Sequence, residues 1–252
     1  MDRDNWFAQY ILGNVQRDVR DYELACETFR TILRKHSSEF VVALSLAQTL
    51  MAWAYSCLRS GEFSKSVELA TEGVMTAASL IEDKEELSEA WKLLGDGAYL
   101  ASLVQVEGSV RLAEYLSQKI FNREEMSGAD AEEPRTAQSK FPPRPRLLEC
   151  NLTAMEKMVE LTAGDRLAQS AAHFNVGLAK YRLLTATTKL TESSVRPILE
   201  CFKKAIQSEP RNFEYWNALG VVTATHFPSV AEKAFSRSLQ INERVTSRLI
   251  LG

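Results

Sequence analysis

The chain has 252 residues, 45% of them hydrophobic, with 30 basic and 33 acidic side chains and a formal net charge of −3. This apolar content is enough for a sizeable core, and runs of alternating β-branched residues are missing, so the expected class is all-α. The near balance of charge provides neither a basic nucleic-acid footprint nor an acidic tail, so we expect no direct nucleic-acid contact.

The first predicted element is a pair of helices near the N-terminus. Leu12-Gly13 is followed twelve residues later by Ala25 and then by Phe29. These steps place the apolar side chains on one face of each helix. We therefore expect Gly13, Ala25 and Phe29 to pack the two helices together.

Two further pairs follow. The second has a long first helix over residues 39–59 and a turn at Gly61, where a positive φ angle suits glycine. The third opens with Trp-Lys-Leu-Leu-Gly, so Trp91 and Gly95 are predicted packing residues, and its second helix is expected over residues 109–122.

Residues 122–146 interrupt the helical periodicity. Their first half is acidic, and their second half is basic and rich in proline. Without a periodic apolar face such a segment cannot offset its ordering entropy, so we expect a disordered linker between repeat blocks at 1–121 and 147–252. Pro142–Pro145 also forms a P-x-x-P sequence, and the alternative is a polyproline-II docking motif.

The fourth pair begins with a helix over Leu167–Leu184 that contains Gly177, and its second helix contains Phe202. The connection between them is about nine residues longer than in the other pairs. It is either a long turn or an extension of both helices.

The segment Arg211–Glu243 has the clearest spacing. Trp216 and Gly220 lie on one face of a first helix, and Phe235 lies on the matching face of a second. Glycine inside a helix costs about 1 kcal/mol relative to alanine, so Gly220 indicates close approach of the partner helix. We expect Trp216 to be a large buried aromatic.

An aromatic residue, Leu-Gly, a turn, and then alanine and phenylalanine, within about 34 residues, is the pattern of the tetratricopeptide repeat. Five such units are recognisable, two of them degenerate. The predicted fold is a superhelical solenoid of antiparallel helix pairs. A single pair cannot bury its apolar face, so such units occur in arrays, which act as binding surfaces.

Residues suited to catalysis or metal binding are not grouped in the sequence. The three histidines lie in different repeats, and the four cysteines form no Cys-x-x-Cys pair. Phosphate-binding glycine loops and zinc spacings are missing. We expect no enzyme activity, cofactor or metal. No apolar run reads as a membrane span, so we expect no membrane partner.

Several strings resemble one family in particular. Trp-Asn-Ala-Leu-Gly-Val-Val at 216–222 follows Lys-Lys-Ala-Ile at 203–206, and the segments at 52–74 and 90–102 agree as well. In these runs the chain is similar to the large tetratricopeptide scaffold subunit of the superkiller (Ski) complex.

The resemblance implies a cytoplasmic scaffold, with a nuclear location also open. In that family the repeats hold a DExH-box RNA helicase and WD-repeat propeller subunits, and associate indirectly with the RNA exosome in 3′-to-5′ decay. The family subunit has no catalytic residues to carry over. Its members are far longer, so we expect this chain to be a fragment.

The binding groove of such repeats is lined by the first helices, at fixed offsets from the Leu-Gly pair. In the two C-terminal units these offsets select Phe174, Leu178, Tyr181, Asn217 and Val221. The apolar majority favours a helix or extended segment as the ligand.

Two alternatives to this groove stay open. The chain's own neighbouring turns fill such grooves in long solenoids. A chaperone-docking module would instead clamp a C-terminal carboxylate, with Asn14, Lys92 and Asn217 as the candidate residues.

Overall fold

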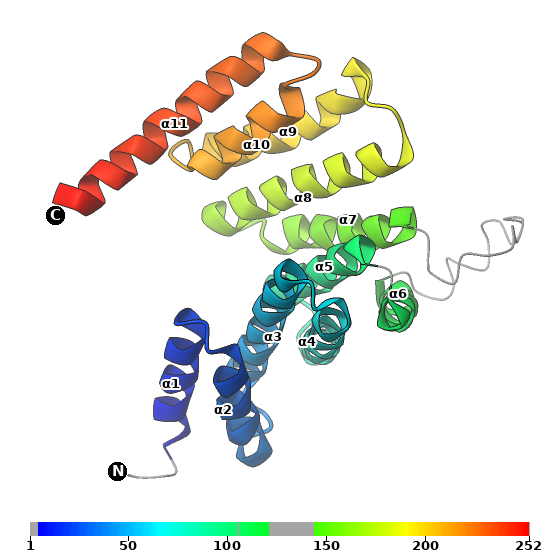
Figure 1. The fold of residues 1–252 in the computed structure, drawn as a ribbon, viewed down its shortest axis with the longest axis vertical. Helices are drawn as coiled ribbons and strands as arrows, with labels where there is room; N and C mark the ends of the chain where they lie inside the picture. Colours follow the sequence, from blue (N-terminus) through cyan, green and yellow to red (C-terminus); the bar gives the residue numbers. More distant parts are fainter. Residues whose placement is uncertain (1–4, 105, 121–143, 252) are drawn as a thin grey trace, which may run out of the picture. The chain divides into compact units, whose positions relative to one another are not determined.

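The computed structural model describes residues 5–104, 106–120 and 144–251 (Figure 1). These residues form eleven α-helices and contain no strand. The chain divides into two compact units, Met1–Ala154 and Met155–Gly252. The all-α architecture of successive helix pairs is the one expected from the sequence.

Unit 1 contains three helix pairs and the first part of α7. The bounds are α1 Trp6–Asp18, α2 Tyr22–Lys35, α3 Phe40–Ser60, α4 Phe63–Asp83, α5 Ser88–Leu103, α6 Glu107–Ile120 and α7 Arg144–Leu161. Unit 2 contains the rest of α7 and two pairs. Their bounds are α8 Arg166–Thr187, α9 Glu192–Ser208, α10 Phe213–Thr223 and α11 Pro228–Leu251.

Polar residues at the helix ends explain where several helices start and stop. The side chains of Asn5 and Asn212 accept hydrogen bonds from the first-turn amides of α1 and α10. Thr191 forms a capping box with Ser194 at the start of α9. Gly61 ends α3 with a φ angle of +81°, the left-handed geometry that glycine tolerates.

The long connection in the fourth pair is mostly helix. α8 continues to Thr187 and α9 starts at Glu192, so only the four residues between them are irregular. The extension of both helices is therefore the correct alternative.

The end of the predicted linker differs from expectation. Arg144, Pro145 and Arg146 form the first turn of α7, where proline is tolerated because its missing amide would have no partner in the helix. The P-x-x-P sequence therefore ends inside a helix, so it is not a polyproline-II segment over its whole length. The remainder of the linker, 122–143, lies outside the described residues.

α7 itself did not stand out in the sequence. Within unit 1 it contributes Leu147, Leu148 and Cys150 to the buried interior. The amide Nδ2 of fully buried Asn151 donates a hydrogen bond of 2.8 Å to the carbonyl oxygen of Gly95 in α5. This buried bond fixes the position of α7 on α5.

The core of unit 1 is built around α3, α4 and α5. α3 is long and apolar enough to cross a membrane by length and composition alone, contrary to the expectation that no apolar run reads as a membrane span. Half of its most apolar stretch is buried inside the protein, where Val42, Leu46, Leu50 and Ala54 belong to the core. Its apolar character is thus explained by packing.

The core of unit 2 is smaller and includes aromatic rings. Phe202 of α9 is fully buried, and Tyr215 of α10 is 4% exposed. Half-buried side chains of α8 and α10 pack against them. This arrangement places three of the predicted groove residues, Phe174, Leu178 and Tyr181, next to the core.

Candidate protein-interaction surface

A contact between glycine and phenylalanine sets the rotation of the first helix in three pairs. If each of these glycines carried a Cβ atom, that atom would lie too close to a phenylalanine ring of the second helix. The shortest distances from the added Cβ to the ring would be 2.6, 3.0 and 2.6 Å, in the order of the pairs given next. The pairs are Gly13 with Phe29, Gly177 with Phe202, and Gly220 with Phe235. This shared contact puts the same positions of α1, α8 and α10 on equivalent faces.

In the third pair a second glycine, Gly97, makes a close approach to the preceding pair. Gly95 is buried, and its carbonyl oxygen accepts the bond from Asn151. It is at Gly97 that a Cβ atom would collide with Val74 of α4. Sequence reasoning missed Gly97, because the Leu-Gly pattern identifies only the first glycine of Gly-Asp-Gly.

The two predicted packing tryptophans are half-buried. Trp91 Nε1 donates to the carbonyl oxygen of Glu85 at 3.1 Å, and Trp216 Nε1 donates to that of Pro210 at 2.9 Å. In both cases the acceptor lies six residues earlier, in the loop before the helix. The expectation of a deeply buried Trp216 is corrected, since the neighbouring Tyr215 takes that place.

The five predicted groove residues lie on α8 and α10, two helices in contact within unit 2. Phe174, Leu178 and Tyr181 are half-buried and pack against the core. Asn217 and Val221 are exposed, Val221 by 49%. The accessible part of this surface is therefore on α10.

Phe174 is largely committed to internal contacts. Its ring centroid lies 5.8 Å from that of Phe202 and 4.6 Å from that of Tyr215. Aromatic pairs at these separations stabilise a core beyond their area of contact. The position of the Phe174 ring therefore agrees with the alternative that neighbouring parts of the chain fill part of the groove.

Tyr215 links this aromatic cluster to the loop before α10. Its hydroxyl donates a hydrogen bond of 2.9 Å to the Glu209 carboxylate. Burial is the largest cause that raises the pKa of Tyr215. The hydrogen bond to Glu209 also raises this pKa, whereas a hydrogen bond with Ser170 lowers it. The phenol is thus a neutral donor that orients α10.

Two of the three residues of the alternative carboxylate clamp have partners of their own. Asn14 donates to the carbonyl oxygen of Tyr10 at 3.1 Å, and Lys92 pairs with Asp96 on the same helix. Binding a peptide carboxylate would require breaking these contacts. The geometry therefore disfavours the clamp.

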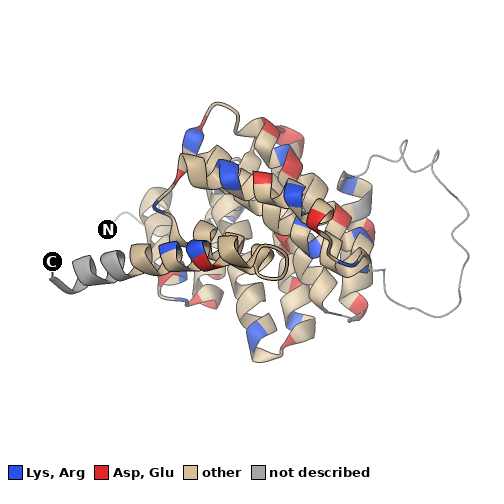
Figure 2. Ribbon diagram, turned by 90° about the horizontal axis from the view of Figure 1, so that it is seen from above, with Lys and Arg blue, Asp and Glu red and all other residues tan. Residues whose placement is uncertain are grey.

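Reactive side chains do not converge in the part of the chain that the structure describes. No group of three or more histidine, cysteine or acidic residues there could hold a metal ion. Burial and nearby Lys204 lower the pKa of His173, and burial raises the pKa of Cys201. Basic and acidic residues are interspersed along the helices, as Figure 2 shows.

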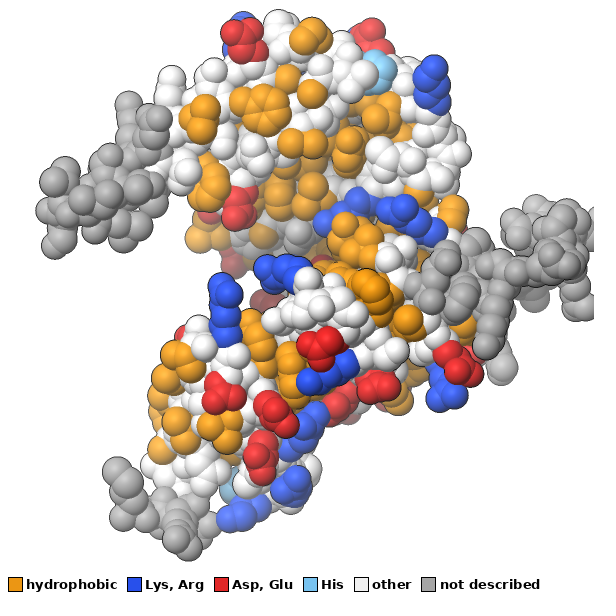
Figure 3. All heavy atoms as spheres, in the orientation of Figure 1, with side chains coloured by type: hydrophobic (Ala, Val, Ile, Leu, Met, Phe, Trp, Pro, Cys, Tyr) orange, Lys and Arg blue, Asp and Glu red, His pale blue; other side chains and the backbone are white. Residues whose placement is uncertain are grey.

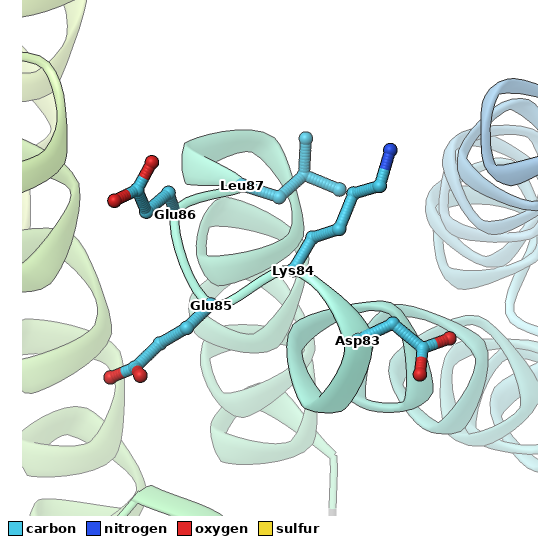
Figure 4. Close-up of a pocket in the computed structure, with 5 residues that line it drawn as sticks. All are labelled: Asp83, Lys84, Glu85, Glu86 and Leu87. Atoms are coloured by element: carbon cyan, nitrogen blue, oxygen red, sulfur yellow. The ribbon is translucent and has the colours of Figure 1, made fainter.

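The acidic loop between α4 and α5 lines a surface depression (Figure 4). The carboxylates of Asp83, Glu85 and Glu86 point in different directions and share no centre. Lys84 lies over the ring of Phe40, 3.3 Å from its centroid. The loop therefore serves to connect the helices and offers no anion or cation site.

A second depression of about 350 Å³ lies on unit 2, between α9 and the end of α10. Its floor is apolar and its rim is charged. It is lined by Arg196, Leu199, Glu200, Lys203, Leu219, Phe227 and Val230. Arg196 and Lys203 are paired with Glu192 and Glu200, so the rim carries little free charge.

Comparison with known proteins agrees with the repeat pattern. Superkiller protein 3 of Schizosaccharomyces pombe is 24% identical over 229 residues, which cover 88% of this chain and 16% of that protein. Over this stretch the chain is similar to superkiller protein 3. Tetratricopeptide repeat protein 37 of Xenopus laevis is 25% identical, over 96% of this chain and 15% of that protein.

The chain thus spans less than one fifth of the length of these two relatives. No protein-family model matches it. Among solved structures, a crystal structure of MamA aligns over 93% of this chain and 96% of its own, with 13% identity and a TM-score of 0.48.

Proposed function

We propose that the chain is part of a non-catalytic, cytoplasmic interaction scaffold of the superkiller type. Its partners are a DExH-box RNA helicase and WD-repeat propeller subunits, through which it associates indirectly with exosome-mediated RNA decay. The observation that carries the proposal is the similarity to superkiller protein 3 over 88% of the chain. Helix pairs with exposed first-helix faces are suited to holding protein partners.

The surface proposed for partner contact is the exposed part of α10. Val221 is an apolar side chain exposed by 49%, and Asn217 lies one turn before it. An apolar anchor beside an amide suits a protein segment better than RNA, whose phosphates need cationic contacts. Phe174 and Tyr181 pack against the core of the same unit.

The test is co-purification with the helicase and propeller subunits at physiological salt. Val221→Glu should reduce recovery of at least one partner, because a carboxylate would replace an apolar contact. Leu239→Glu on α11, exposed by 62%, is the matched control and should leave recovery unchanged.

Two results would argue against different parts of the proposal. If the unmodified chain recovers neither partner, the superkiller-type role is wrong. If Val221→Glu and Leu239→Glu both retain full recovery, the scaffold role stands and this surface of α10 is rejected.

A further inference from the structure

One face of α1 exposes a continuous row of apolar side chains. Phe7, Ile11, Leu12, Val15 and Val19 are 57, 47, 51, 53 and 69% exposed. Their spacing of three and four residues puts them along one side of the helix. Figure 3 shows apolar side chains gathered over α1.

The other first helices reveal what this face does. Each of these first helices has a glycine at the Leu-Gly position of the repeat, namely Gly13, Gly95, Gly177 or Gly220. We compared three positions relative to that glycine: five residues before it, one residue before it and two residues after it. In α10 these are Tyr215, Leu219 and Val222, which are 4, 7 and 3% exposed. α10 contacts the preceding second helix α9, so these positions are buried between successive pairs.

α5 and α8 repeat this burial. The equivalent positions are Ala90, Leu94 and Gly97 in α5, and Ala172, Val176 and Ala179 in α8, all of them buried. At the last of the α5 positions, Gly97 lies against Val74 of the preceding helix α4. The face therefore serves as the contact between one helix pair and the pair before it.

In α1 the same positions are Ala8, Leu12 and Val15, and all three are exposed. Leu12 and Val15 are identical in type to Leu219 and Val222 of α10. α1 thus has the side chains of a contact between helix pairs, and none of the described residues covers them.

We propose that this face of α1 binds the second helix of a further tetratricopeptide-type helix pair, joined ahead of Asn5 in a longer polypeptide. The surface continues the series of contacts that α4 makes with α5 and α9 makes with α10. The chain spans only 16 and 15% of its relatives, so most of the length of each relative lies outside the region compared. The inference concerns unit 1 alone and does not depend on the partners proposed above.

The chain provides its own probe for the test. Residues 165–211, which form α8 and α9, are fused directly ahead of Asn5, so that Arg211 precedes Asn5 as it precedes Asn212 in the native chain. Asn5 and Asn212 both cap the following helix, so the junction is equivalent. The readout is amide hydrogen exchange of α1, compared between the fusion and the unfused chain.

The fused pair should slow exchange of the α1 amides at least about tenfold, because covering the apolar face stabilises the helix. Leu12→Asp with Val15→Asp should abolish the slowing. The same double variant of the unfused chain should keep its helical circular dichroism, since both side chains are exposed there.

Three results would overturn the proposal. The first is equal α1 exchange with and without the fused pair. The second is slowing that persists in the double variant. The third is a dimer of the unfused chain, seen by light scattering, that the double variant dissociates, which would make a second copy the occupant.

Discussion

The two units use the same helix-pair plan with different side chains between the helices. The core of unit 1 consists mainly of alanine and leucine, and glycines at 73 and 97 lie against the neighbouring helix. The core of unit 2 is centred on Phe202 and Tyr215, with Phe174 against both. Around α3, α4 and α5 of unit 1 the helices approach through small residues, whereas aromatic rings fill the core of unit 2.

This difference predicts opposite sensitivities to mutation. Closely packed helices have no space for added atoms, whereas a core filled by rings loses most when a ring is removed. The α3–α5 part of unit 1 should therefore respond most to enlarged glycines, and the aromatic cluster of unit 2 to truncated rings.

The largest effect is expected in unit 2. Phe202→Ala removes a fully buried ring that contacts Gly177 and Phe174, and should lower the free energy of unfolding by about 3–5 kcal/mol. Urea denaturation followed by tryptophan fluorescence measures this, and Trp216 is the one of the chain's four tryptophans that lies in unit 2. A loss below about 1 kcal/mol, typical of a surface position, would contradict the ring-filled core.

Gly97→Ala tests the close packing of unit 1. The new Cβ would collide with Val74, a branched side chain with little freedom on its helix, so we expect a loss of about 1–3 kcal/mol. This loss should appear despite the better helix propensity of alanine. Gly164→Ala is the control, because nothing lies within 4 Å of its Cβ position.

A smaller effect is expected for Trp216→Ala. The half-buried ring gives up part of its apolar contact and the hydrogen bond to Pro210, which together suggest about 1–2 kcal/mol. Because this variant lacks the fluorescent reporter, circular dichroism in urea is the appropriate measurement. A loss as large as that of Phe202→Ala would show that Trp216 is a core residue after all.

The smallest expected effect concerns pH. Burial raises the pKa of Cys26 from 9.0 to about 11, so the folded chain keeps the thiol proton where the unfolded chain releases it. Stability should be fully present below pH 9 and fall as the pH rises toward 11. Urea midpoints at pH 8.5 and 10.5 should differ less in Cys26→Ala than in the unmodified chain. Equal differences in the two proteins would refute the assignment to Cys26.

The periodicity of the sequence predicts a contact well where only one residue type can occupy a position. Glycine opposite phenylalanine recurs because only glycine lets the ring approach the first helix, and the spacing shows this in the linear chain. α7 was harder to find. Its interior bond from Asn151 to Gly95 joins residues 56 positions apart, a contact that no local pattern encodes.

For the candidate surface, too, the sequence predicts one part and only the structure shows the other. The residues that the offsets from Leu-Gly select lie on α8 and α10, since helical geometry fixes which positions share a face. Those offsets could not tell that Phe174 stacks on Tyr215 while Val221 stays exposed. Exposure depends on the side chains that neighbouring helices bring.

The sequence by itself determined the helix pairs, their boundaries within a few residues and the contact face of each first helix, because these follow from local periodicity and capping. Only the tertiary structure decided which faces are covered. Leu12-Gly13 and Leu219-Gly220 are the same dipeptide in the same register, yet Leu219 is buried against α9 and Leu12 is exposed. Burial is a property of the neighbouring helix, and the pattern of a single helix does not contain it.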